Sequence, residues 1–237
     1  MSRERFLKRI RNAVQAGLNT DNHDELSFPY GSCHANLESK CKTILNDAFE
    51  KSDNLFDQLA KRAESSGWRV VKLSDLRSVG EYVSILAAER NSGSVVASGQ
   101  EVIQNIELQD HVDTDVFFIQ KSMEEDAREK CIEADIGVTG VEYAIAETGT
   151  CVLTAGDRLN RLVALTPPVH VAVVTKGQVL PSLDELFVLR QKDSKEEVMP
   201  AYTNLISGPS RSADIEYKLI TGVHGPGEVH LVLVNES

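Results

Sequence analysis

The sequence has little of what membrane proteins or nucleic-acid-binding proteins need. Its 237 residues include only 5% aromatic residues, and 25 basic residues stand against 36 acidic ones, a net charge of −11. No apolar run approaches the roughly 20 residues that span a bilayer. An acidic chain also lacks the basic face that nucleic-acid binding normally requires. We therefore expect no membrane span and no nucleic-acid partner.

Cysteine is also scarce, and its placement argues against a metal centre. None of the four cysteines stands in a C-x-x-C pair or in the spacing of an iron–sulfur site. We expect no iron–sulfur cluster and no metal site on this chain, and the sequence leaves its cofactor unknown. The first ten residues carry charges where a signal peptide would have an unbroken apolar run, which predicts a cytoplasmic protein.

The apolar pattern predicts an N-terminal arm followed by an α/β domain. Apolar residues at four-residue spacing predict a helix over 3–18, and a polar, turn-rich loop follows over 19–36. We place the domain boundary there, with the arm at 1–36 and the α/β domain at 37–237. Within that domain we expect helices at 38–66, 75–90, from Ser122, at 141–147, from Ser182 and at 212–220. We expect strands at 68–73, 95–97, 112–119, 136–139, 150–154, 170–174, 204–207 and 229–234.

Short, continuous apolar strands between helices favour a parallel sheet that is covered on both faces. The predicted fold class is therefore α/β, with three layers and a mostly parallel sheet. Ligands of such open sheets bind at the carboxyl ends of the strands. The unusual residues of this sequence gather in three clusters at junctions of strand and helix.

The first cluster occupies residues 134–150 (ADIGVTGVEYAIAETGT). Gly140 would end a strand and permit close approach of a ligand or a neighbouring segment. Glu147 would end a helix, where a carboxylate opposes the macrodipole, so we consider it a catalytic candidate. The alternative is a surface carboxylate that is bonded to nearby backbone. Thr148 and Thr150 would add hydroxyls to the same ligand site.

The second cluster, within 206–216 (ISGPSRSADIE), combines a Gly/Pro turn with the predicted start of a helix. Unpaired N–H groups of that helix, the hydroxyls of Ser210 and Ser212, and the guanidinium of Arg211 would together bind phosphate or carboxylate. Gly208 shapes the turn. The alternative interpretation is that Ser212 caps the helix and Arg211 forms a surface ion pair.

The third cluster, 222–230 (GVHGPGEVH), is a glycine-rich loop that carries His224. A histidine there can act as an acid or base near neutral pH. The alternative is a solvent-facing histidine in a turn. Two further histidines, His170 and His230, fall inside predicted strands, where we interpret them as hydrogen-bonded core or edge residues.

These three motifs, together with 168–174 (PVHVAVV), resemble the LUD-domain family over roughly residues 130–234. The resemblance implies a fold like that of the sugar-phosphate isomerase and CoA-transferase group. It also implies a role in oxidising L-lactate to pyruvate as one of three proteins, of which the other two carry the iron–sulfur cysteines.

Three hypotheses for function follow. In the first, the chain is a component of a lactate-oxidising system with iron–sulfur partner proteins, and Glu147 and His224 handle protons beside a small anionic metabolite held by Arg211. In the second, it is a stand-alone acyl- or CoA-transferase-like enzyme with Glu147 as nucleophile. In the third, it is an anion-binding regulatory module.

Overall fold

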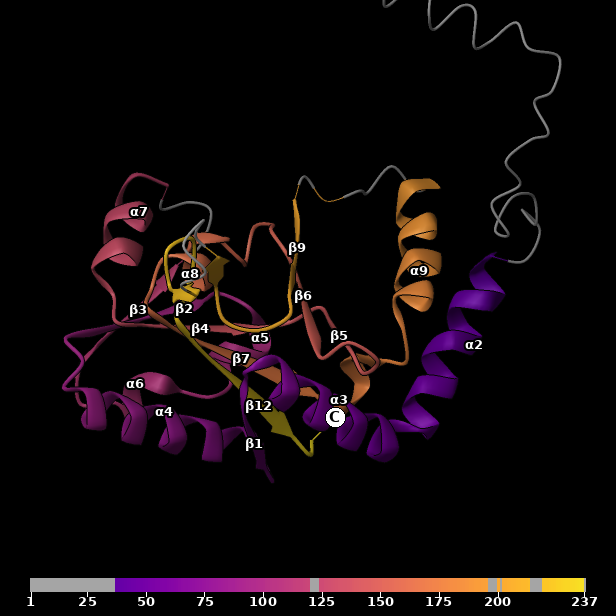
Figure 1. Cartoon of the computed structure of the whole chain (residues 1–237), viewed down its shortest axis with the longest axis horizontal. Coiled ribbons are helices and arrows are strands. Elements are labelled where there is room, and N and C mark those ends of the chain that lie inside the picture. Colours follow the sequence, from indigo (N-terminus) through magenta and orange to yellow (C-terminus); the bar gives the residue numbers. More distant parts are fainter. Residues whose placement is uncertain (1–36, 120–123, 196–199, 201, 214–218, 237) are drawn as a thin grey trace, which may run out of the picture. The chain divides into compact units, whose positions relative to one another are not determined.

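Six parallel strands form the central sheet of the computed structural model, which describes residues 37–119, 124–195, 200, 202–213 and 219–236 (Figure 1). These strands are β1 (Arg69–Leu73), β2 (Ser94–Ser98), β3 (Asp115–Ile119), β4 (Ile136–Gly140), β7 (Val169–Thr175) and β12 (Glu228–Val234). Their order is β1-β12-β7-β4-β2-β3, and every neighbouring pair is parallel. The predicted mostly parallel sheet is confirmed.

Helices cover both faces of this sheet, as predicted. One face packs against α4 (Leu76–Arg90), α5 (Glu101–Gln104) and α6 (Leu108–His111). The other packs against α7 (Glu124–Glu133) and α8 (Leu162–Leu165), which lie above the sheet in Figure 1. Successive residues of a strand point to opposite faces, so Val95 of β2 enters the first core and Val96 the second.

A smaller sheet with the order β8-β5-β6-β9 accompanies the central one. Its strands are β5 (Tyr143–Ile145), β6 (Thr150–Thr154), β8 (Val179–Leu180) and β9 (Thr203–Ile206), with the short helix η3 (Lys176–Gln178) before β8. Helix α3 (Ser52–Ser66) contacts both β1 and β8. Helix α2 (Leu37–Glu50) touches α9 (Leu183–Lys195) through the Cys41 thiol and the Val188 carbonyl.

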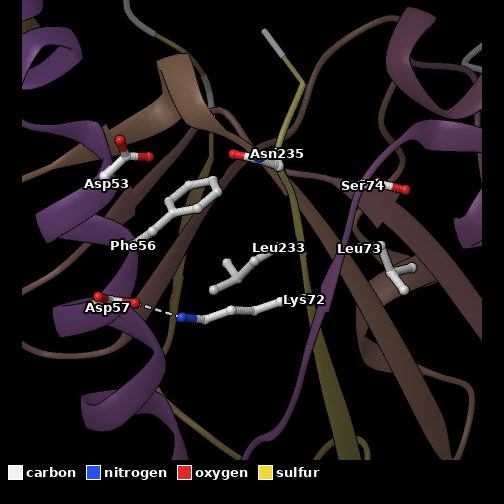
Figure 2. Close-up of a pocket in the computed structure, with 8 residues that line it drawn as sticks. All are labelled: Asp53, Phe56, Asp57, Lys72, Leu73, Ser74, Leu233 and Asn235. Atoms are coloured by element: carbon white, nitrogen blue, oxygen red, sulfur yellow. Dashed lines mark hydrogen bonds and ion pairs between the residues drawn. The ribbon is translucent and has the colours of Figure 1, made fainter.

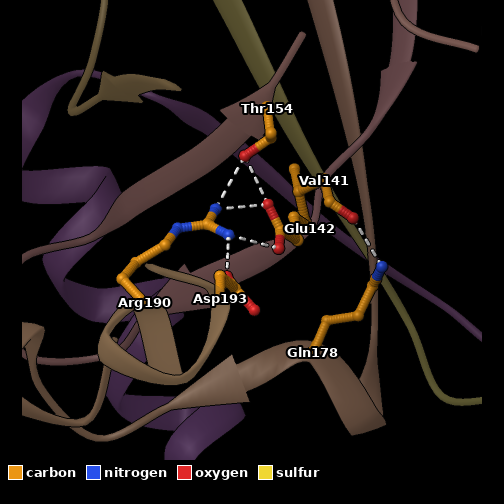
Figure 3. Close-up of polar contacts among 6 residues, drawn as sticks. All are labelled: Val141, Glu142, Thr154, Gln178, Arg190 and Asp193. Atoms are coloured by element: carbon orange, nitrogen blue, oxygen red, sulfur yellow. Dashed lines mark hydrogen bonds and ion pairs between the residues drawn. The ribbon is translucent and has the colours of Figure 1, made fainter. Parts of the chain in front are cut away.

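Figure 3 shows how α9 is joined to the smaller sheet. The guanidinium of Arg190 binds the carboxylate of Glu142 at 2.9 Å (Nη1 to Oε1) and 2.5 Å (Nη2 to Oε2). It also donates to Asp193 Oδ2 at 2.9 Å and to Thr154 Oγ1 at 2.7 Å. Burial opposes the charge of Arg190, but the hydrogen bonds to Glu142 and Asp193 outweigh it and raise the pKa of the guanidinium.

Three of the predicted helices are wrong in part or in full. The segment 141–147 forms β5, which pairs with β6 and β8. The segment 212–220 forms parts of two antiparallel strands, β10 (Arg211–Ala213) and β11 (Leu219–Thr221), at its described ends. The helix expected over 38–66 is divided at Lys51 into α2 and α3. In the first two segments, local helix propensity is weak and long-range strand pairing overrides it.

The arm predicted over 1–36 and the helix start at Ser122 lie outside the described residues. The domain boundary at residue 36 therefore stays a prediction. Within the described part of the chain, no helix combines the length and the apolar character needed to cross a bilayer.

Candidate functional site

A pocket of about 290 Å³ brings together residues from distant parts of the chain. It is lined by residues of α8, β7, β9, β10 and β12 and by the turns that follow β9 and β11. Of the predicted site residues, four line it: Gly208, Ser210, Arg211 and His224. The described walls contain a guanidinium and no carboxylate, although the chain as a whole carries a net charge of −11. This pocket is our candidate site.

Arg211 is the cation of this pocket, and the end of α3 fixes its position. Its Nη2 donates a hydrogen bond of 2.9 Å to the backbone carbonyl oxygen of Ser66, the last residue of α3. Gly208 lies against the same carbonyl, since a Cβ at Gly208 would stand 2.5 Å from the Ser66 oxygen. The φ angle of Gly208 is +123°, a conformation that side chains disfavour. The turn after β9 therefore packs closely against the C-terminal end of α3.

Ser210 joins the two loops of the pocket. Its backbone N–H donates to the Pro226 carbonyl at 2.9 Å, and its carbonyl accepts from the Gly222 N–H at 3.0 Å. Its hydroxyl oxygen accepts from the backbone N–H of His224 at 3.3 Å. These bonds hold the loop that carries His224 against the loop that carries Arg211.

The anion receptor differs in kind from the one we predicted. Because residues 211–213 form β10, no helix begins at Ser212, and the predicted N–H groups of a first helical turn are not present there. Ser212 pairs with Ile220 of β11 instead. The guanidinium of Arg211 and the Ser210 hydroxyl remain as anion-binding groups in the described pocket.

The pocket also lies at a different end of the strands from the one expected. Its residues His170 and Val229 are each the second residue of their strands, β7 and β12, and they pair with one another. Gly140 ends β4 at the opposite, carboxyl end, where a Cβ would stand 2.7 Å from Cγ1 of Val102. Gly140 thus allows α5 to approach β4 and is not among the described residues that line the pocket.

Glu147 and Thr148 lie in the tight turn between β5 and β6, and the Glu147 side chain is exposed. The helix end predicted for Glu147 is therefore wrong. Hydroxyls connect this turn with the pocket, because Thr150 Oγ1 is 2.7 Å from Thr148 Oγ1 and 2.7 Å from Ser207 Oγ. Ser207 lines the pocket, whereas Glu147, Thr148 and Thr150 are not among its described lining residues.

His170 is a hydrogen-bonded core residue, as we interpreted it, but it also lines the pocket, which the sequence did not predict. It is fully buried on β7, and its Nε2 is 2.9 Å from Oγ1 of Thr139. Its Nδ1 has no hydrogen-bond partner among the described residues. Burial, with a smaller contribution from His230, lowers the pKa of His170 to about 3, so the ring is neutral near pH 7. The apolar strand around it gave no signal that one face meets a pocket.

The loop that carries His224 ends at Glu228, which a charged network holds in place. Glu228 Oε1 is 2.6 Å from Arg69 Nη1 and 2.7 Å from Nε2 of buried His230, and Arg90 binds its other oxygen. Tyr82 approaches Nδ1 of the same imidazole at 2.5 Å. Burial disfavours the charged form of Glu228. The hydrogen bonds that it accepts from His230 and Arg90, together with their charges, outweigh this effect and keep the pKa of Glu228 below its usual value. His230 is thus a hydrogen-bonded core residue, as we interpreted it.

A second, larger pocket of about 460 Å³ lies between α3 and the carboxyl ends of β1 and β12 (Figure 2). Its charged side chains are already engaged. Lys72 Nζ is 2.5 Å from Asp57 Oδ1, and this hydrogen bond lowers the pKa of Asp57. Asp53 Oδ1 is 2.6 Å from Lys176 Nζ. We therefore prefer the pocket of Arg211 as the ligand site.

No group of three or more histidine, cysteine or acidic side chains among the described residues is placed to hold a metal ion.

The LUD domain family model matches residues 56–234 of the chain. Lactate utilization protein C of Halalkalibacterium halodurans is 40% identical over 109 residues, which are 46% of this chain and 47% of that protein. The Bacillus subtilis protein of the same name is 37% identical over 108 residues, 45% of each chain. The one from Macrococcus caseolyticus is 30% identical over 162 residues, 67% of this chain and 69% of that protein. The match thus spans about half the length of the first two relatives.

A solved structure has the same fold. The crystal structure of a DUF162 family protein from Deinococcus radiodurans superposes with a TM-score of 0.54 and covers 77% of this chain and 98% of that one. The two sequences are 22% identical, so this likeness concerns the fold alone. The family model covers all six strands of the central sheet, most of α3 and both loops of the pocket. On that match, the chain belongs to the LUD domain family.

Proposed function

We propose that the chain is a component of lactate utilisation, in which it binds the small carboxylate of the reaction while iron–sulfur partner proteins take up the electrons. The name of the similar proteins, lactate utilization protein C, supports the process. The observation that carries the proposal is the pocket in which Arg211 stands among hydroxyls with no acidic residue in the described walls.

The pocket has the chemistry that a short carboxylic acid requires. A guanidinium binds a carboxylate strongly because two parallel N–H groups match its two oxygens. The hydroxyls of Ser207 and Ser210 can donate to the same oxygens. A water molecule takes about 30 Å³ of liquid volume, so a pocket of about 290 Å³ has room for a three-carbon acid.

Oxidation of L-lactate to pyruvate removes two electrons and two protons. Because the sequence has no cysteine spacing for an iron–sulfur cluster, the proposal assigns the electrons to partner proteins. His224 is the candidate for proton transfer that lines the pocket. Glu147 stays a candidate because it precedes Thr148, whose hydroxyl is connected through Thr150 to Ser207 of the pocket.

Acyl transfer by a stand-alone enzyme has less support from the site. A nucleophile must reach the bound substrate, and the exposed Glu147 side chain is not among the described residues of the pocket. Intact-mass measurement after incubation with an acyl-CoA tests this alternative, because a covalent adduct that disappears in Glu147→Gln would favour it.

Titration calorimetry of the full chain with L-lactate, pyruvate and the neutral lactamide tests the proposal. We expect the two acids to bind and lactamide not to bind. Arg211→Gln should weaken acid binding by about tenfold or more, since a hydrogen bond to a charged group is lost. The matched control is Arg158→Gln, an exposed arginine that does not line the pocket and should leave binding unchanged.

Two results would contradict the proposal: no binding of either acid, or binding that Arg211→Gln leaves unchanged. The assignment of partners needs a second experiment, in which the tagged chain is purified from its native cells. Co-purification of proteins with the absorbance of iron–sulfur clusters would support it. If the chain by itself oxidised lactate with an artificial electron acceptor, this would contradict the assignment of electron transfer to partner proteins.

A further inference from the structure

His170 lines the candidate pocket, and one of its ring nitrogens has no hydrogen-bond partner among the described residues. The side chain is fully buried and lines the pocket, and Nδ1 has no partner among the described residues. A buried polar atom without a partner is rare in folded proteins, because it loses its bonds to water and gains none. The indole nitrogen of Trp68, whose ring centre is 6.5 Å from that of His170, is likewise unpartnered among the described residues. Two neighbouring side chains thus each have a buried nitrogen without a hydrogen-bond partner among the described residues.

The contact with Thr139 favours one position of the proton on the His170 ring. The Thr139 side chain is fully buried, and its hydroxyl lies 2.9 Å from Nε2. A buried hydroxyl has to donate its hydrogen, and Nε2 is the acceptor that this contact provides. A neutral imidazole carries one hydrogen, so an Nε2 that accepts leaves Nδ1–H as a donor. His170 therefore offers one N–H group.

The remaining walls of the pocket show what kind of oxygen this N–H would meet. Arg211 can hold a carboxylate, and Ala164, Leu165 and Val229 supply apolar surface. Every polar side chain in the described walls can donate a hydrogen bond. An acid with a further acceptor oxygen next to its carboxylate would therefore match these walls.

We propose that His170 recognises the oxygen on the second carbon of a 2-oxo or 2-hydroxy acid, to which Nδ1–H donates while Arg211 holds the carboxylate. The inference rests on the proposed function, since it requires an acid in this pocket. It assigns His170 as a specificity-determining residue for the acid of the proposed function.

The test compares pyruvate with propionate, which has the same carboxylate and no oxygen on the second carbon. We expect the wild-type chain to bind pyruvate about tenfold more tightly, the typical effect of one hydrogen bond to a buried donor. In His170→Gln, the amide can replace Nε2 at Thr139 but leaves nothing at the position of Nδ1, so the preference should disappear. In the matched variant His170→Asn, an amide nitrogen can stand at the position of Nδ1, and much of the preference should remain.

A measurement on the wild-type chain keeps the test independent of how well the variants fold. Two-bond ¹H–¹⁵N spectra of the histidine side chains, assigned with His170→Asn, distinguish the two neutral tautomers. We expect His170 to carry its proton on Nδ1, and we expect that resonance to move with pyruvate and to remain in place with propionate. Thr139→Val should remove the bias toward this tautomer.

The outcomes separate this inference from the proposed function. Equal binding of pyruvate and propionate, both weakened by Arg211→Gln, would overturn the role of His170 and leave the carboxylate pocket intact. A preference for pyruvate that survives His170→Gln, or a His170 protonated on Nε2, would also overturn it. Failure of the wild-type chain to bind either acid would instead contradict the proposed function.

Discussion

The guanidinium of Arg211 donates to the backbone carbonyl oxygen of Ser66 at 2.9 Å, which couples the candidate pocket to the C-terminal end of α3. Carbonyl groups at the end of a helix carry a partial negative charge, so a guanidinium is favourable there. Gly208 lies against the same carbonyl. The position of the cation therefore depends on how closely the turn after β9 approaches the helix.

Gly208→Ala should disturb both stability and ligand binding. The new Cβ would stand 2.5 Å from the Ser66 oxygen at a φ of +123°, so the turn has to move away from α3. We expect a loss of about 1–3 kcal/mol in the free energy of unfolding, measured with urea, and weaker binding of pyruvate. Gly156→Ala is the control, because no atom lies within 4 Å of its Cβ position. Equal stability of the two variants would contradict the prediction.

Arg190→Ala should lower the free energy of unfolding by about 2 kcal/mol or more, because it leaves a partly buried carboxylate without its partner. The Arg190 side chain is 13% exposed and binds Glu142 with both terminal nitrogens. The matched control is Arg158→Ala, whose side chain is 70% exposed and 3.8 Å from Glu101. Exposed pairs contribute little, so that variant should stay within about 0.5 kcal/mol of wild type in urea unfolding. Similar losses in the two variants would show that Arg190 does not anchor α9.

The fold could be predicted from sequence where strands are buried on both faces. The continuous apolar runs at 95–97, 136–139, 170–174 and 229–234 correspond to the inner strands β2, β4, β7 and β12. The same reasoning failed at β5 and β10, which have only three residues each. Strands this short carry no period of their own, and their partners lie elsewhere in the chain, such as Val152 opposite Tyr143.

The site could be predicted only in part, for a related reason. Ser210, Arg211 and His224 meet because a short antiparallel pair of strands joins their loops, and the glycine and proline residues marked both turns. The continuous apolar run around His170 predicts that it is buried but not which element covers it. In the folded chain α8 and β9 leave space beside it, which depends on long-range packing. Gly140 was recognised as a position of close approach, although its neighbour is α5.

The described cysteines should be unreactive in the folded chain. Cys131 and Cys151 are fully buried and Cys41 is 4% exposed. Burial raises the pKa of Cys131 to about 11 and that of Cys151 still further, so little of the reactive thiolate is present near pH 8. In Cys33→Ser, we expect Ellman's reagent to react slowly with the native protein and rapidly with the remaining thiols in denaturant. Rapid reaction under native conditions would show that one of these sites opens.

Acid should destabilise the fold from about pH 6.5 downward, the ordinary pKa of histidine. Burial lowers the pKa of both His170 and His230, so the unfolded chain takes up protons that the native chain does not bind. The free energy of unfolding should fall by up to about 1.4 kcal/mol per pH unit for each histidine. For His170 this loss of stability continues down to about pH 3, which is the pKa of His170 in the folded chain. Urea unfolding between about pH 7 and pH 5 measures this slope. His170→Gln should make it shallower, and an unchanged slope in that variant would show that His170 takes up a proton in the folded chain.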